Sequence, residues 1–154
     1  MIQQQGRLLG IALRSRSRAA MEEVETAVIT KDNGVLKDSR GAAGPRQVTL
    51  LAAESWDRTC EALGKVLPWT DRRANLLVEG IRLEQSTGSV IHVGDVTLEV
   101  TGETDPCSRM DEIETGLRAA LMPEWRGGVC CRVLVGGTLS KGAPIRMESP
   151  NESA

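Results

Sequence analysis

The stretch VIHVGDVTLEVT, from Val90 to Thr101, is the clearest structural signal in the chain. Apolar and polar residues alternate along it, which is the pattern of β-strands with one buried face. Gly94-Asp95 lies at its centre and is a typical two-residue turn of a β-hairpin. Closing the hairpin there pairs Ile91 with Leu98 on the buried face and sends His92 to the opposite face. The sequence therefore predicts an antiparallel hairpin of fixed register.

Short apolar or alternating segments of the same kind occur along most of the chain. The further strands that we expect are residues 7–13, 24–28, 48–52, 73–79, 129–135 and 145–147. Arg14, Arg16 and Arg18 follow the first of these strands at alternate positions. An extended backbone would therefore project the three guanidinium groups to one side.

Helical signals are fewer. One helix follows the strand at 48–52, with an apolar stripe that runs to Leu67 before Pro68 ends it. A short helical turn is expected after Ser108, a suitable N-cap, and another helix over residues 117–122. Six or more strands against two or three helices favour a mainly β fold. We expect a barrel of mostly antiparallel strands with two or three flanking helices.

Length and composition narrow the class of protein. A chain of 154 residues is expected to form a single domain over residues 1–154, with a polar tail from about residue 149. With 19 basic and 21 acidic residues the net charge is -2, so any anion-binding site must be local. Three Trp and no Phe or Tyr predict an aliphatic core and argue against a nucleic-acid partner.

No apolar run approaches the roughly 20 residues that a bilayer requires, so no membrane partner is expected. The N-terminal Met-Ile-Gln-Gln-Gln is too polar for a signal peptide. A cytoplasmic location is the resulting expectation.

The chain has four cysteines, which are expected to be free thiols: Cys60, Cys107, Cys130 and Cys131. They contain no C-x-x-C pair and the chain has one histidine, so a structural zinc site is not expected. Cys107 precedes the expected N-cap Ser108, and a helix N-terminus favours a thiolate, whereas Glu103 and Asp105 oppose it. Its local sequence leaves a reactive thiol and a small buried apolar side chain both open.

Arginines and a long loop suggest an anion site. Residues 31–46 are rich in Gly, Asp, Asn and Ser, and loops of this length in compact domains are usually functional or disordered. This loop carries Asp38, Arg40 and Arg46, and Arg73 follows later. These arginines could converge on a phosphate by bidentate contacts, although separated arginines commonly form solvated faces.

Several segments, in this order, resemble the MOSC domain, which occurs at the C-terminus of molybdenum cofactor sulfurases and as stand-alone bacterial proteins. The segments that carry the resemblance are Gly34–Asp38, Arg46–Glu54, Arg73–Gly80, Val93–Val96, Thr101-Gly102, Pro106-Cys107 and Cys131–Gly137. No single segment is specific, whereas their order and spacing together are.

The resemblance implies a strand-rich barrel with a cleft in which Cys107 handles sulfur or ligates molybdenum. It also implies that basic and polar residues hold the phosphate of a pterin, the molybdenum cofactor molybdopterin. The residues matching those positions are Arg73 and Asn75 in an R-x-N motif, with Asp38, Arg40 and Arg46 in the loop motif.

Three hypotheses for function follow from the resemblance. The first is a protein that binds molybdopterin, or carries sulfur as a Cys107 persulfide for cofactor or metal-sulfur assembly, or does both. The second is a molybdoenzyme that reduces N-hydroxylated compounds, with Cys107 as the metal ligand and electrons from a separate reductase. The third is a binding module without catalytic activity. The first implies a sulfur donor such as a pyridoxal-phosphate-dependent cysteine desulfurase as partner.

Overall fold

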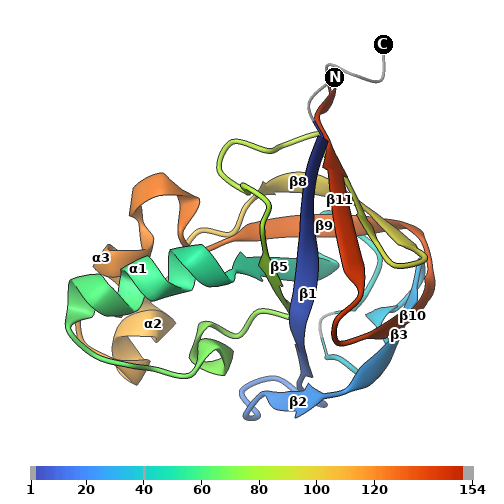
Figure 1. The fold of residues 1–154 in the computed structure, drawn as a ribbon. Helices are drawn as coiled ribbons and strands as arrows, with labels where there is room; N and C mark the ends of the chain where they lie inside the picture. The colour runs from blue at the N-terminus through green and yellow to red at the C-terminus, as the bar shows by residue number, and fades with distance from the viewer. Residues whose placement is uncertain (1–2, 40, 151–154) are drawn as a thin grey trace.

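The computed structural model describes residues 3–39 and 41–150, and within them seven strands close into a barrel (Figure 1). In order around the barrel they are β11 (Pro144–Glu148), β7 (Val90–Val93), β8 (Val96–Glu103), β9 (Val129–Val135), β5 (Val48–Ala52), β6 (Leu76–Glu79) and β1 (Gln3–Leu13). Pairing of β1 with β11 closes the barrel. The neighbours are antiparallel except β5 and β6, which are parallel. The mainly β, mostly antiparallel barrel predicted from the sequence is therefore confirmed.

A smaller sheet lies beside the barrel. It consists of β10 (Gly137–Ser140), β3 (Thr26–Thr30) and β4 (Gly34–Val35), while β2 (Glu22–Val24) pairs with β1. The strand expected over residues 24–28 is thus divided between β2 and β3. Residues of β3 alternate between its two faces. Ala27 and Ile29 pack into the barrel core, whereas Val28 is exposed.

The predicted hairpin is confirmed in its register. Ile91 pairs with Leu98 across β7 and β8, and both side chains are fully buried. His92 pairs with Thr97 on the other face, where its Nδ1 lies 3.3 Å from the threonine hydroxyl. The buried residues inside the barrel are aliphatic apart from Cys131 and Met147, as the lack of Phe and Tyr predicts.

The helices gather on one side of the barrel (Figure 1). They are α1 (Ala53–Leu63), α2 (Ser108–Ile113) and α3 (Leu117–Leu121), with the 3-10 turns η1 (Trp69–Arg72) and η2 (Pro123–Trp125). Trp56 anchors this helical lobe, since its side chain is buried and Nε1 donates a hydrogen bond to the Leu67 carbonyl at 2.9 Å. Among the described residues, no helix has the length and apolar character needed to cross a membrane.

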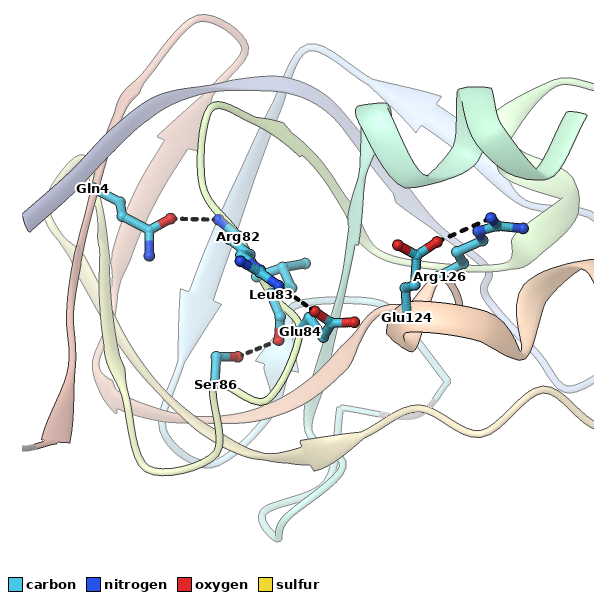
Figure 2. A network of polar contacts seen from close by, with 7 residues as sticks. All are labelled: Gln4, Arg82, Leu83, Glu84, Ser86, Glu124 and Arg126. Atoms are coloured by element: carbon cyan, nitrogen blue, oxygen red, sulfur yellow. Dashed lines mark hydrogen bonds and ion pairs between the residues drawn. The ribbon is translucent and has the colours of Figure 1, made fainter. Parts of the chain in front are cut away.

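Polar contacts fix the loop between β6 and β7. Figure 2 shows that the backbone N–H of Arg82 donates to Gln4 Oε1 at 2.6 Å, while the Arg82 guanidinium pairs with Glu84. The Ser86 hydroxyl donates to the Leu83 carbonyl at 2.6 Å. The β6–β7 loop is thereby tied to β1.

Several boundaries differ from the sequence predictions. Helix α1 ends at Leu63, because Gly64, with a φ of 70°, caps the helix before Pro68 is reached. Strand β6 begins at Leu76 rather than Arg73, because Arg73 has a φ of 69° and closes η1. The N-cap of α2 is Cys107 rather than Ser108.

The expectation that Arg14, Arg16 and Arg18 extend the first strand is wrong. Strand β1 ends at Leu13, and the chain then turns through Arg18, whose φ is 65°. Arg14 is buried and its backbone N–H donates to Asp38, whereas Arg16 and Arg18 are exposed. The three guanidinium groups therefore share no face. The end of the expected polar tail, residues 151–154, lies outside the described residues.

Candidate functional site

Two adjoining cavities lie where the barrel meets the helical lobe. The larger has a volume of about 450 Å³ and the smaller about 60 Å³. They share Thr49, Arg73 and Thr104 as lining residues, so they form one groove. We call the part bounded by residues 42–46, Asn75 and Cys130 the large chamber. The part bounded by Arg72, Cys107 and Arg109 is the small chamber.

The groove brings together most of the site residues expected from the sequence. Asp38, Arg46, Arg73 and Asn75 line the large chamber, and Cys107 lines the small chamber. Arg73 lines both. Arg40 lies outside the described residues. Segments that are far apart in the sequence thus meet at one place.

Asn75 links the strands beneath the large chamber. Its side chain is buried, and Oδ1 accepts hydrogen bonds from the backbone N–H of Thr49 at 3.1 Å and from the Thr49 hydroxyl at 3.3 Å. Its Nδ2 donates to the carbonyl of Ala12 at 3.2 Å. The amide therefore joins β1 and β5 to the start of β6 and shapes the chamber wall.

Arg73 and Asp38 hold the loop of residues 14–21 beside the groove. The Arg73 Nη2 donates to the Ala19 carbonyl at 2.9 Å. At the other end of the loop, the backbone N–H of Arg14 donates to Asp38 Oδ1 at 3.0 Å, and the N–H of Ser39 donates to the Arg14 carbonyl at 2.8 Å. Two of the expected site residues therefore also order the adjacent backbone.

Gln47 positions the loop that carries Asp38, a role that the sequence analysis missed. The side chain is buried, and its Nε2 donates to the carbonyls of Lys31 at 2.6 Å and Gly41 at 3.3 Å. Its Oε1 accepts from the N–H of Val133 at 2.9 Å. The sequence did contain a signal, because Gln47 is a polar residue directly before the apolar strand 48–52. When such an amide is buried, it needs partners for both its N–H and its carbonyl group.

Arg72 organises the small chamber and was also missed. It is buried, its Nε donates to the Gly127 carbonyl at 3.0 Å and its Nη2 to the Thr104 carbonyl at 3.0 Å. Its Nη1 lies 3.8 Å from the sulfur of Met110. One guanidinium thus joins η1, the segment after β8 and the segment before β9. Arg72 and Arg73 are adjacent and equivalent as sequence signals. Only the fold shows that Arg72 holds the wall of the small chamber, whereas Arg73 lines both chambers.

Cys107 is exposed at the mouth of the small chamber. Its backbone is extended, with φ of -115° and ψ of 176°, and its side chain makes no capping hydrogen bond to α2. The preceding Pro106 is buried, and its carbonyl accepts from Arg118 Nε at 3.3 Å. The segment is therefore fixed while the thiol stays accessible.

The other thiols are in less accessible environments. Cys130 is buried beside the large chamber, with its sulfur 3.2 Å from the Thr104 hydroxyl. Cys131 lies in the barrel core, and burial raises the pKa of its thiol. Neighbouring residues of a strand point to opposite faces, and here both are buried. Cys130, on the face of β9 away from the barrel core, is covered by Thr104, which follows β8.

Positive charge is concentrated in the groove. Arginines 14, 46 and 73 line the large chamber, and arginines 72, 73 and 109 line the small one. Asp38 supplies a carboxylate to the large chamber. A chain with a net charge of -2 thus contains a locally cationic groove, which favours an anionic ligand.

A separate groove of about 500 Å³ shares no lining residue with the two chambers. Three of its charged residues form ion pairs: Arg82 with Glu84 (Figure 2), and Glu124 with Arg126 at 3.0 Å. The lining has three carboxylates, from Glu54, Glu84 and Glu124, and two guanidinium groups, from Arg58 and Arg82, so this groove is not cationic.

The sequence profile of the MOSC domain matches residues 37–146. The chain belongs to the MOSC domain family. This family is associated with binding of the molybdenum cofactor. The matched region of the MOSC domain contains Asp38, Arg46, Arg73, Asn75 and Cys107.

Solved structures share the fold of this MOSC domain. The YuaD protein from Bacillus subtilis is 19% identical, with a TM-score of 0.80 over 96% of this chain and 98% of that chain. YiiM from Geobacillus stearothermophilus is 16% identical, with a TM-score of 0.76 over 94% and 75% of the two chains. YiiM from Escherichia coli is 17% identical, with a TM-score of 0.68 over 93% and 70%. No curated protein sequence matches the chain.

A molybdenum site built from protein side chains alone does not fit this MOSC domain. Among residues 3–39 and 41–150, no three His, Cys, Asp or Glu side chains cluster so that they could hold a metal ion. Cys107 offers a single accessible thiol to the groove. A pterin that supplied further sulfur ligands itself would need one thiolate from the protein, which Cys107 could provide.

Proposed function

We propose that the large chamber binds molybdopterin and that Cys107 carries sulfur as a persulfide for cofactor or metal-sulfur assembly. The observation that carries the proposal is the position of Arg73, which lines both the large chamber and the chamber of Cys107. A phosphate-bearing ligand held by this guanidinium would lie next to the thiol.

The size and charge of the large chamber support a pterin ligand. Its volume of about 450 Å³ is within the usual range of about 300–1,000 Å³ for small-molecule pockets. Arg73 and the exposed Arg46 are suited to bidentate contacts with phosphate oxygens. The Asp38 carboxylate can accept hydrogen bonds from ring N–H groups of the pterin.

The accessibility of Cys107 supports the role in sulfur transfer. A persulfide carrier needs a thiolate that a donor can reach. Cys107 is exposed, whereas Cys130 and Cys131 are buried and less accessible to a donor. We propose a cytoplasmic sulfur donor, such as a pyridoxal-phosphate-dependent cysteine desulfurase, as its partner.

When bound, the cofactor would supply molybdenum redox chemistry, and Cys107 would then be suited to act as a soft thiolate ligand. This defines the alternative function, a reductase component that receives electrons from a separate protein. The two functions differ in what is attached to Cys107, either an additional sulfur atom or the metal.

The experiment is mass spectrometry and metal analysis of the protein purified from a molybdenum-replete host. We expect a pterin in the wild type, and a mass increase of one sulfur atom on Cys107. Arg73→Ala should lower pterin content about tenfold, since it removes a charged phosphate contact. The exposed Arg16 provides the matched control, because Arg16→Ala makes the same charge change away from both chambers.

The outcomes separate the alternatives. Sulfur that persists in Cys107→Ser contradicts the role of Cys107. One molybdenum atom per wild-type molecule, absent from Cys107→Ser and accompanied by no added sulfur, supports the reductase component instead. Absence of pterin, metal and added sulfur from the wild type would favour the non-catalytic module.

A further inference from the structure

A third cavity adjoins the large chamber and has no part in the proposed function. Its volume is about 300 Å³, at the lower end of the usual range of about 300–1,000 Å³ for small-molecule pockets. It shares Met21 and Arg73 with the lining of the large chamber. We call it the third chamber, and its other lining residues are Arg18, Ala19, Ala20, Thr70, Asp71 and Ile113. The two adjoining cavities together suit a ligand longer than a pterin.

Asp71, in the lining of the third chamber, has a carboxylate without a protein partner. The residue lies in η1 and its side chain is half-buried. Within residues 3–39 and 41–150, no group donates a hydrogen bond to this carboxylate and no basic group lies within ion-pair distance of it. Partial burial raises the pKa of the carboxyl, since the charge has lost water and gained no partner. A ligand that offers N–H donors would satisfy it.

Two arginines line the same chamber. The Arg73 Nη2 donates to the Ala19 carbonyl, and Arg73 lies where the large and third chambers adjoin. Arg18 is exposed, and no carboxylate in the described part of the chain lies within ion-pair distance of its guanidinium. The chamber therefore suits a ligand that carries both an anionic group, for the arginines, and N–H donors, for Asp71.

A nucleotide has this combination, and guanine is the base that matches a carboxylate. Its N1–H and N2 amino group are adjacent donors, so the two oxygens of one carboxylate can accept from both. Adenine, cytosine and uracil each place an acceptor beside the donor, and that acceptor repels a carboxylate. Met21 and Ile113 supply apolar surface for the faces of the base.

We propose that the third chamber is a guanine-nucleotide subsite, in which Asp71 accepts from the base while Arg18 and Arg73 contact the phosphate. The link of this subsite to the pterin rests on the proposed function. The cofactor would then be the dinucleotide form, in which a guanosine phosphate is joined to the phosphate of the pterin. Arg73 lines both chambers and so lies where the two phosphates would meet.

The test measures binding of GMP, IMP, AMP and inorganic phosphate by isothermal titration calorimetry, with protein purified from a host that does not synthesise the pterin. We expect GMP to bind at least tenfold more tightly than AMP, with IMP, which lacks the N2 amino group, between them. Asp71→Asn should lower the affinity for GMP about tenfold without weakening the binding of inorganic phosphate. Asp57→Asn makes the same charge change at an exposed position of α1 outside the three chambers and should match the wild type.

Thermal unfolding separates this role from a structural one. Because the Asp71 carboxylate has no partner among the described residues, Asp71→Asn should leave the midpoint of unfolding unchanged or raise it. The comparison of GMP with IMP uses the wild type alone, so it tests the contact to the base even if Asp71→Asn fails to fold.

Mass spectrometry of the pterin released from protein of a molybdenum-replete host identifies the form of the cofactor. A pterin monophosphate alone, together with equal affinities for GMP and AMP, would overturn the inference and leave the proposed function intact. Preference for GMP that depends on Asp71, in a protein that takes up no pterin, would support the subsite and contradict the proposed function. Absence of both the preference and the pterin would overturn both.

Discussion

The carboxamide oxygen of Asn75 accepts two hydrogen bonds from Thr49, one from its backbone N–H at 3.1 Å and one from its hydroxyl at 3.3 Å. The resemblance to the MOSC family suggested Asn75 as a cofactor contact. In the structure these bonds, with the one to Ala12, join strands beneath the groove. Arg73, two residues earlier, lines the groove.

Asn75→Ala should lower the free energy of unfolding by about 2–3 kcal/mol, because it leaves buried backbone and hydroxyl groups without partners. Urea denaturation measures this change. Thr49→Ser keeps the hydroxyl and serves as the control, with a smaller expected loss. Unchanged stability of Asn75→Ala together with weaker pterin binding would instead identify Asn75 as a ligand contact.

Cys107 should be the first thiol alkylated by iodoacetamide in the folded protein. It is exposed, whereas Cys60 is half-buried and Cys130 and Cys131 are buried. The raised pKa of Cys131 further lowers its thiolate fraction at neutral pH. Labelling followed by digestion and mass spectrometry gives the rate at each site. Labelling of Cys60 as fast as Cys107 would remove the argument from accessibility.

Gly127→Ala should distort the small chamber. A Cβ at this position would lie 2.6 Å from the Thr104 carbonyl oxygen and 3.0 Å from Arg72 Nη2, so the Arg72 contacts must shift. We expect a loss of about 1–3 kcal/mol in unfolding free energy, as for other overpacked sites. Gly102→Ala is the control, since a Cβ there meets no atom within 4 Å. Equal unfolding midpoints for the two variants would contradict the tight packing around Arg72.

Glu103 should make the stability of the protein depend on pH. Desolvation, and then the nearby charge of Asp105, raise the pKa of its carboxyl above the ordinary value of 4.5. The folded state therefore binds this proton more tightly than the unfolded state. The contribution of the protonated Glu103 carboxyl to folding stability is fully present below the ordinary pKa. It is lost as the pH rises through the pKa of the folded state.

Glu103→Gln should therefore be more stable than the wild type at about pH 7, and the difference should vanish at about pH 3, where the carboxyl is neutral in both states. Urea denaturation at both pH values measures the difference. A gain that is the same at both would show that it arises from packing rather than from titration.

Local patterns predicted the elements of the barrel and missed several of their ends. The alternation in residues 90–101 fixed which side chains face inward, because a strand repeats every two residues. The C-terminal end of α1 and the start of β6 depended instead on left-handed backbone at Gly64 and Arg73. A non-glycine residue such as Arg73 adopts this conformation because tertiary contacts support it, and no sequence signal marked it.

The sequence by itself determined an aliphatic, mostly antiparallel barrel, a cysteine beside a short helix and a set of arginines dispersed along the chain. Only the tertiary structure decided which of these arginines meet. Arg14, Arg46 and Arg73 reach one chamber because barrel closure brings the segments that carry them together, while Arg16 and Arg18 stay exposed. Side-chain direction within a strand follows from a local repeat, whereas convergence across tens of residues depends on strand pairing and packing of the whole barrel.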